Sequence, residues 1–261
     1  MNLSTMTYSV QDRVASIRFT RPEAANSVTP EFARDLREVM LAIEFDDDVR
    51  AAAVTAEGKV FCAGGDLKQF HAAGADVAHL AADMLVDFHG AIYKMNRIPK
   101  PFVAGIRGAA GGAGLSLASS FDLVVSSDRA KYTMAYTRAG VTPDGTSSYF
   151  IARHIGLRRM LDLTLTNRVL SATEAESWGL VNRLVPDDEV DDATLALAEE
   201  LASGPWAVGA AKRVIYQGFE SPLEQAGEFE EQMITQAMRG PDGLEGIAAF
   251  AEKRAPDFRG E

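Results

Sequence analysis

The sequence predicts an α/β fold that ends in a helical C-terminal part. Strand-like and helix-like segments alternate through the first half of the chain, which is typical of a sheet covered by helices. Residues 14–20 alternate between apolar and polar side chains, as a half-buried strand does. Apolar side chains then recur at helical spacing from Phe32 to Ile43, after turn and cap residues at 26–30. From Thr146 onward the patterns are mainly helical.

The other elements are predicted in the order of the chain. Short apolar runs predict buried strands at 51–56 and 102–106, and a long helix at 77–97 is expected to end before Pro99 and Pro101. No fixed-period repeat and no low-complexity linker interrupt this plan. We also expect a loop at 57–66, short strands at 123–126, 131–133 and 181–185, and helices from about 113 and at 147–154, 157–165, 172–177, 193–202, 206–217, 223–238 and 243–254.

The composition is that of a globular protein with an acidic surface. Of the 261 residues, 47% are hydrophobic and 24% charged, and the formal charge of −11 disfavours nucleic acid and anionic membranes as partners. The single cysteine, Cys62, excludes an internal disulfide. Residues 1–9 lack the pattern of a signal peptide, and no apolar run approaches the ~18 residues of a membrane span. We therefore expect a cytoplasmic protein.

Two glycine-rich segments follow predicted strands, FCAGGDLK at 61–68 and GAAGGAGLSLA at 108–118. Glycine lets a backbone approach a ligand closely, and the second segment opens a helix whose first N–H groups are free. One N–H group from each segment would suffice for an oxyanion hole, which holds a carbonyl oxygen as it becomes negative. The alternatives are packing of a strand on a helix and a dinucleotide-binding turn. The second segment lacks GxGxxG spacing, and GxxxxGK[ST] does not occur.

Several motifs, in order, resemble the crotonase superfamily, also called the enoyl-CoA hydratase/isomerase superfamily. They are RPEAANSVTPE, FCAGGDLK, GAAGGAGLSLASSFDLV, PDGTSSYFIARHIG, LTNRVLSATEAESWGLVNRLV and GIAAFAEKR. The resemblance covers essentially the whole chain and is closest to the isomerase-type members of phenylacetate degradation. It implies a spiral of ββα units with an acyl-CoA site over residues 1–200 and a helical trimerisation region over 201–261. It also implies trimers or dimers of trimers, with coenzyme A as part of the substrate and no separate cofactor.

The resemblance also implies the residues that bind the substrate. The thioester oxygen would accept the N–H groups of Gly65 and Ala113, where alanine replaces the usual glycine but keeps the N–H donor. Two residues near the C-terminus would reach the CoA of a neighbouring subunit. An exposed lysine on a late helix is, however, also common on an ordinary protein surface. The adenine pocket maps onto Ala25, Ala63, Asp66 and Leu67, and the pair that reaches the neighbouring subunit is Phe250 and Lys253.

The carboxylates decide which reaction is expected. Hydratases of this superfamily use two glutamates, and the matching positions here are Ser116 and Tyr136, so hydration is not expected. Asp144, in the PDG of TPDGTSSYF, is the carboxylate that replaces them, with a helix N-cap as the alternative role. A single carboxylate suits proton transfer between two carbons of an enolate, which is double-bond isomerisation. Tyr136 would line the acyl pocket, or it is a plain core aromatic.

His89 opens a second possibility. The 4-chlorobenzoyl-CoA dehalogenase branch has a histidine at this position and an aspartate at that of Asp144. Asp144 would then attack an aryl carbon, and His89 would activate the water that hydrolyses the ester. Against this, that branch has a tryptophan at Tyr136 and a bulky aromatic at Gly65, and most histidines on helices lie at a surface or in packing. No Cys/His cluster suggests a metal site.

Three hypotheses follow from these residues. The leading one is an acyl-CoA isomerase that shifts a double bond, or rearranges a ring-epoxide acyl-CoA, with Asp144 as acid and base. The second is a dehalogenase-like enzyme or thioester hydrolase with Asp144 as nucleophile. The third is a non-catalytic acyl-CoA-binding paralogue that acts as a scaffold or RNA-associated subunit, although the acidic charge weighs against RNA.

Overall fold

The alternating segment predicted at 14–20 forms the second strand of a six-stranded sheet. In the computed structural model, which describes residues 1–260, the strand order is β1-β2-β3-β4-β6-β9. β1 and β2 pair antiparallel, and every other neighbouring pair is parallel. Parallel strands are buried on both faces, which explains the apolar sequences of the central strands. The strands are β1 (Met6–Gln11), β2 (Val14–Phe19), β3 (Ala51–Ala56), β4 (Phe102–Ile106), β6 (Leu123–Ser127) and β9 (Arg183–Val185).

A smaller sheet of three strands, in the order β5-β7-β8, is formed by segments that lie in the connections between strands of the main sheet. β5 (Ala109–Gly111) pairs parallel with β7 (Lys131–Thr133), which pairs antiparallel with β8 (Val169–Ser171). An isolated bridge from Cys62 to Ala110 joins the loop after β3 to this sheet. The connection from β4 to β6 therefore contributes β5 to the smaller sheet, and the connection from β6 to β9 contributes β7 and β8.

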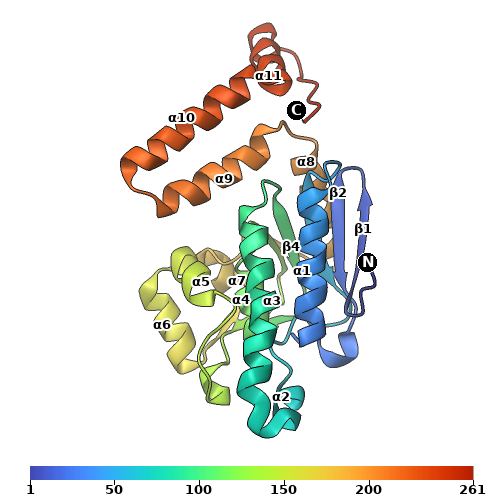
Figure 1. Ribbon diagram of the computed structural model, residues 1–261, viewed down its shortest axis with the longest axis vertical. Helices are drawn as coiled ribbons and strands as arrows, with labels where there is room; N and C mark the ends of the chain where they lie inside the picture. The colour runs from blue at the N-terminus through green and yellow to red at the C-terminus, as the bar shows by residue number, and fades with distance from the viewer. Residues whose placement is uncertain (261) are drawn as a thin grey trace.

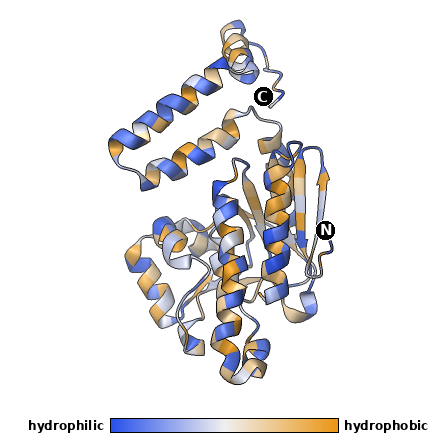
Figure 2. Cartoon of the chain, viewed as in Figure 1, coloured by the Kyte–Doolittle hydropathy of each residue, from blue (hydrophilic) through white to orange (hydrophobic). Residues whose placement is uncertain are grey.

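Helices α1 (Pro30–Phe45) and α3 (Val77–Arg97) cover one face of the main sheet, and α8 (Val190–Ala202) covers the other (Figure 1). The apolar stripe predicted for α1 is buried from Phe32 to Ile43. Thr29 caps this helix, since its hydroxyl accepts the Phe32 N–H at 3.2 Å. Figure 2 shows apolar residues along α1 and α3. Burial of this stripe against the sheet makes the main core.

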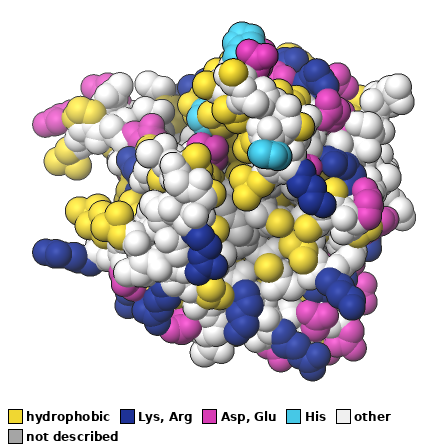
Figure 3. All heavy atoms as spheres, turned by 90° about the horizontal axis from the view of Figure 1, so that it is seen from below, with side chains coloured by type: hydrophobic (Ala, Val, Ile, Leu, Met, Phe, Trp, Pro, Cys, Tyr) yellow, Lys and Arg dark blue, Asp and Glu magenta, His cyan; other side chains and the backbone are white. Residues whose placement is uncertain are grey.

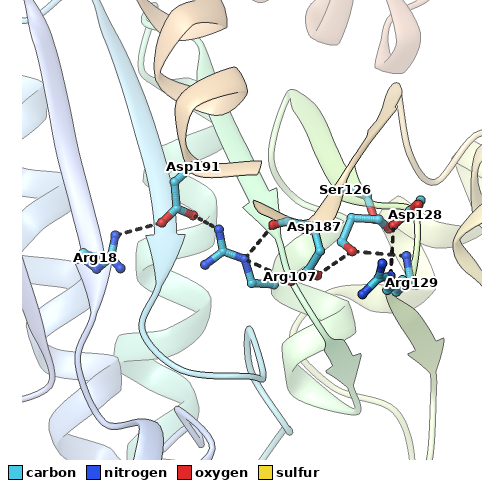
Figure 4. Close-up of polar contacts among 8 residues, drawn as sticks. Arg18, Arg107, Ser126, Asp128, Arg129, Asp187 and Asp191 are labelled. Carbon is cyan, nitrogen blue, oxygen red and sulfur yellow. Dashed lines mark hydrogen bonds and ion pairs between the residues drawn. The ribbon is translucent and has the colours of Figure 1, made fainter. Parts of the chain in front are cut away.

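Charged side chains join the start of α8 to the sheet (Figure 4). Asp191 accepts from Arg18 on β2 at 3.1 Å and lies 3.2 Å from Arg107, which follows β4. Arg107 Nε also donates to the carbonyl oxygen of Asp187 at 3.0 Å, and the Ser127 hydroxyl donates to the Asp187 carboxylate at 2.6 Å. These groups are partly exposed, so each ion pair adds little stability by itself. Together they fix the direction in which α8 starts.

The remaining helices of the core lie in the connections between strands. Four short 3-10 turns, at 22–24, 74–76, 137–139 and 187–189, complete these connections. The α-helices are α2 (Leu67–Ala73), α4 (Ala113–Ala118), α5 (Ser147–Ile155), α6 (Leu157–Thr166) and α7 (Ala172–Trp178).

A helical arm projects from the core after α8 (Figure 1). It consists of α9 (Ala207–Glu220), α10 (Leu223–Arg239) and α11 (Pro241–Glu252). Its anchor is Lys212, whose Nζ donates to the Asp122 carboxylate at 2.8 Å and to two backbone carbonyls at 2.7 and 3.0 Å. Burial lowers the pKa of Lys212, and the charge of Asp122 opposes that shift. Lys212 thus ties α9 to the core through one buried, fully bonded ammonium group.

The predicted class, an α/β core with a helical C-terminal part, is confirmed. The helix at 77–97 and the strands at 51–56 and 102–106 have the predicted bounds. Besides the 3-10 turns, one α-helix and three strands were not predicted: α2, β1, β5 and β8. Within residues 1–260, no helix is both long and apolar enough to span a bilayer, and no group of His, Cys, Asp and Glu side chains is arranged to hold a metal ion. The division at residue 200 and the cytoplasmic location stay predictions.

Candidate active site

The two glycine-rich segments lie side by side. Gly111 N donates to Cys62 O at 3.0 Å, next to the bridge between Cys62 and Ala110. Gly114 is pressed so closely against the first segment that a Cβ atom there would collide with the Cys62 carbonyl oxygen. Glycine at 114 is therefore required by the close approach of two backbones. The chain from Cys62 to Gly65 consequently runs along the start of α4.

Two backbone N–H groups at this contact have no hydrogen-bond acceptor within residues 1–260. Ala113 is the first residue of α4, where an N–H has no helical partner. Gly65 is bridged to Val28, but the two hydrogen bonds of that bridge use Gly64 O and Asp66 N. A Cβ atom on Gly64 would lie 3.3 Å from Ala113 N, so the two segments touch here. Gly65 and Ala113 therefore offer two free donors on adjacent segments.

A polar cluster assembles beside these donors from four separate segments. The Tyr136 hydroxyl donates to Asp144 Oδ1 at 2.5 Å, and the Ser116 hydroxyl lies 2.8 Å from the same phenol oxygen. Ser116 belongs to α4, Tyr136 follows β7, and Asp144 precedes α5. His89 on α3 completes the cluster, because its Nε2 accepts the Gly145 N–H at 3.2 Å. The structure thus brings together His89, Tyr136 and Asp144, three of the candidate site residues.

Asp144 does not cap the helix that follows it, so the alternative role of this residue is wrong. The N-cap of α5 is Thr146, and no side chain caps that helix. The Asp144 carboxylate instead accepts from Tyr136, while the backbone carbonyl of Asp144 accepts the N–H and the hydroxyl of Ser147 at 3.2 and 2.9 Å. The Asp144 carboxylate therefore does not cap α5 and is instead bonded to Tyr136 within the polar cluster.

Gly145 holds the Asp144 loop against two helices. A Cβ atom at this position would lie 2.7 Å from the Ser116 Cβ on α4 and 2.9 Å from the Phe88 ring on α3. The backbone φ of +58° is also one that glycine adopts without strain. The loop that carries Asp144 is thus closely packed against α4, the helix that begins at Ala113.

Burial shifts the titrating groups of the cluster in different directions. It raises the pKa of Asp144, and the Tyr136 hydrogen bond and the charge of His89 oppose that rise. It lowers the pKa of His89, against the charge of Asp144. It also raises the pKa of the Tyr136 phenol, and Asp144 adds to this rise. Near neutral pH the cluster therefore holds a neutral imidazole, a neutral phenol and a carboxyl group that accepts a proton more readily than usual.

The four residues assigned to the adenine pocket lie on two neighbouring segments. Ala63 N donates to Ala25 O at 3.1 Å, which joins the segments directly. Asp66 Oδ1 accepts two N–H groups of the first turn of α2, and its Oδ2 accepts the Ser27 hydroxyl at 3.3 Å. The side chain of Leu67 is exposed. Figure 3 shows this end of the molecule, where apolar side chains and Lys and Arg side chains surround a recess.

Phe250 and Lys253 lie far from this cluster within one chain. Both are exposed at the end of α11, which Figure 1 places at the opposite end of the molecule from α2. Lys253 adopts a left-handed backbone conformation as the C-cap of that helix. Their predicted contact with CoA would therefore have to be made with another subunit, and it stays a prediction.

The family assignment comes from comparison with known proteins. The model of the enoyl-CoA hydratase/isomerase family matches residues 9–261. The chain belongs to this family. Among solved structures, this hydratase/isomerase family member is similar to an enoyl-CoA hydratase from Polaromonas, with a TM-score of 0.92 and 30% identity over 97% of this chain and 99% of that chain. An enoyl-CoA hydratase from Bacillus anthracis also gives 0.92, with 29% identity over 99% and 100%. The predicted crotonase fold is confirmed.

Two curated relatives of this hydratase/isomerase family member carry out different reactions. The 4-chlorobenzoyl coenzyme A dehalogenase-2 of Arthrobacter is 36% identical over 245 residues, which is 93% of this chain and 88% of that protein. The 1,2-epoxyphenylacetyl-CoA isomerase of Escherichia coli is 31% identical over 257 residues, 97% of each chain. The chain is therefore an acyl-CoA-processing enzyme of the crotonase superfamily. Because relatives that are 31% and 36% identical carry out different reactions, the reaction of this chain has to be inferred from the geometry of its site.

Ser116 is the site residue that sequence reasoning did not recognise. It entered only as a position without a glutamate, yet its fully buried hydroxyl is within hydrogen-bond distance of Tyr136. The available signal was its place three residues after Ala113, one turn along a helix that starts at the expected oxyanion hole.

Cys62 lies next to the site but is predicted to be unreactive. The thiol is fully buried, and burial raises its pKa to about 12. Because the thiolate is the nucleophile, we expect no reaction of the native protein with Ellman's reagent near pH 8 and one thiol per chain after unfolding in urea. Rapid labelling of the native protein would show that the loop around Cys62 opens in solution.

Proposed function

We propose that the protein is an acyl-CoA isomerase with Asp144 as its single acid and base. The observation that carries this proposal is the cluster around Asp144, in which one half-buried carboxylate is surrounded by the neutral side chains of Ser116, Tyr136 and His89. Its other oxygen, Oδ2, makes no hydrogen bond within residues 1–260 and is free to take a proton. One carboxylate that gains and returns one proton is sufficient for isomerisation.

The steps balance with these groups alone. The Asp144 carboxylate removes a proton from C2 of a 3-enoyl-CoA, and the thioester becomes a dienolate. The N–H groups of Gly65 and Ala113 hold the negative oxygen. Protonated Asp144 then returns the proton to C4, so the double bond moves from C3–C4 to C2–C3. The same arrangement supports rearrangement of a ring-epoxide acyl-CoA. No separate cofactor is required.

Substrate binding is proposed from the same resemblance. Ala25, Ala63, Asp66 and Leu67 would hold the adenine end of CoA, and Phe250 and Lys253 would reach the CoA of a neighbouring subunit. Apolar side chains along the arm support self-association as a trimer or a dimer of trimers, because they are largely exposed on the single chain. The most exposed of them are Ile215 (68%), Leu223 (83%) and Phe250 (88%).

A second reaction is favoured by one specific contact. Gly145 N donates to His89 Nε2, which places the imidazole beside the residue that follows Asp144. With this neighbour, Asp144 would displace halide from an aryl carbon to form an ester. His89 would then take a proton from the water that hydrolyses the ester. In this arrangement, however, the Nε2 lone pair is occupied by the backbone N–H. The bonded carboxylate of Asp144 also argues against a non-catalytic paralogue.

A panel of CoA thioesters separates these reactions. The purified protein is offered a 3-enoyl-CoA, crotonyl-CoA and a 4-halobenzoyl-CoA, with thiol release followed in parallel. We expect a conjugated 2-enoyl-CoA from the first and no hydration of the second, since Ser116 and Tyr136 carry no carboxylate. Halide release with an aryl–enzyme adduct would overturn the isomerase proposal. Rapid hydration of crotonyl-CoA would show that the protein hydrates enoyl-CoA without carboxylates at positions 116 and 136.

A further inference from the structure

The phenol of Tyr136 lies between two polar groups, and its single proton fixes the direction of both hydrogen bonds. An ionised carboxylate accepts hydrogen bonds only, so Tyr136 must donate to Asp144 Oδ1 at 2.5 Å. The phenol has no second proton. Ser116 must therefore donate its own proton to the Tyr136 oxygen at 2.8 Å. Both hydroxyl dipoles then point towards the carboxylate.

The environment favours this direction at each step. Ser116 is fully buried and Tyr136 is 7% exposed, so little water reaches either hydroxyl. The other acceptor near Ser116 is Gly112 O at 3.2 Å, which is farther away and already accepts the N–H groups of Leu115 and Ser116. The phenol oxygen is the nearer acceptor.

We infer that Ser116 and Tyr136 form a directed hydrogen-bond relay that holds Asp144 ionised and aimed at the substrate. Both act as positioning residues, and their role rests on the proposed function of Asp144. The relay starts on α4, three residues after Ala113, and Gly145 packs on the same serine. One short helix therefore sets the distance between the oxyanion donor and the base.

The relay has a measurable electrostatic consequence. The titratable groups that act on Asp144 are Tyr136, through its hydrogen bond, and His89, through the charge of its protonated form, and both oppose the rise in pKa caused by burial. Loss of the Tyr136 hydroxyl removes one of these two, so the pKa of Asp144 must rise. A hydrogen bond to a charged group corresponds to about 1 to 2 pH units.

The experiment titrates Asp144 directly and does not depend on substrate. The carboxyl carbons of aspartate are labelled with 13C, and the Asp144 signal is assigned by its loss in Asp144→Asn. We expect Tyr136→Phe to move the Asp144 midpoint to higher pH by about 1 to 2 pH units. Ser116→Ala is expected to move it less, and to add nothing further in the Tyr136→Phe background. The control is Tyr132→Phe, which removes another buried phenol, bonded to Ser126 at 2.5 Å, and should leave the midpoint unchanged.

Kinetics on the isomerase substrate supply the second readout. We expect Tyr136→Phe to lower kcat by about 10- to 100-fold, as for other general-base perturbations, with a smaller change in KM and an acid limb displaced to higher pH. An unchanged midpoint in Tyr136→Phe, or an additional effect of Ser116→Ala in that background, would overturn the relay. If Asp144→Asn keeps full activity, the proposed function is wrong, and the 13C titration still decides the relay. Urea unfolding of each variant checks that the fold is retained.

Discussion

Asp144→Asn is expected to lower kcat by about 10²- to 10⁴-fold, the contribution of a well-placed general base. The amide has the shape of the carboxylate and retains an oxygen that accepts from the Tyr136 hydroxyl, so the cluster should keep its geometry. It cannot take the proton from C2 or return one to C4. The measurement is kcat for conversion of a 3-enoyl-CoA, with KM expected to change much less.

The same substitution should not destabilise the protein. Burial raises the pKa of Asp144, so the folded state binds this proton more tightly than the unfolded state. Stability therefore falls as pH rises from the ordinary aspartate pKa to the raised one, and the cost stays constant above that range. Near neutral pH we expect the Tm of Asp144→Asn to be equal to or higher than that of the parent, with the difference shrinking below about pH 4.

A matched control separates catalysis from a general effect of lost charge. Asp83 is an exposed carboxylate on α3, and its ion-pair partner within residues 1–260 is the exposed His79. Asp83→Asn should change neither kcat nor Tm appreciably. Full isomerase activity in Asp144→Asn would show that Asp144 is not the acid and base of the reaction.

Lys212→Met is expected to lower the free energy of unfolding by about 3 to 5 kcal/mol, the usual cost of breaking a buried ion pair from one side. The ammonium fills three acceptors, and its loss leaves the Asp122 carboxylate without its counter-charge among buried groups. Asp122 would keep the Phe102 N–H at 2.8 Å and the Tyr216 hydroxyl at 3.1 Å, which neutralise no charge. Urea unfolding at a fixed protein concentration measures the loss.

The double variant Lys212→Met with Asp122→Asn tests the cause. Because it removes both charges, it should recover part of the loss. Lys59→Met removes an exposed lysine and should change the unfolding free energy by less than about 0.5 kcal/mol. A loss of under about 1 kcal/mol for Lys212→Met would show that the arm does not depend on this pair.

Elements with a strong local pattern were predictable from sequence, and elements made by pairing were not. α3 is 21 residues long and ends just before prolines, while β3 is apolar except for Thr55 and β4 is apolar throughout. By contrast β5 and β8 have three residues each and are strands only because β7 lies beside them. α2 buries no residue completely, so it lacks the apolar stripe by which a helix is recognised. Local patterns carry no information about such partners.

The sequence by itself determined the family, the glycine-rich segments and the replacement of two glutamates by Ser116 and Tyr136. Those features depend only on which residues occur and on their order along the chain. Only the tertiary structure decided that Asp144 is bonded by Tyr136 instead of capping α5, and that Ser116 stands behind Tyr136. The reason is physical: these side chains and His89 come from four segments of the chain. A hydrogen bond between them depends on distances and directions that exist only after the sheets and helices have packed.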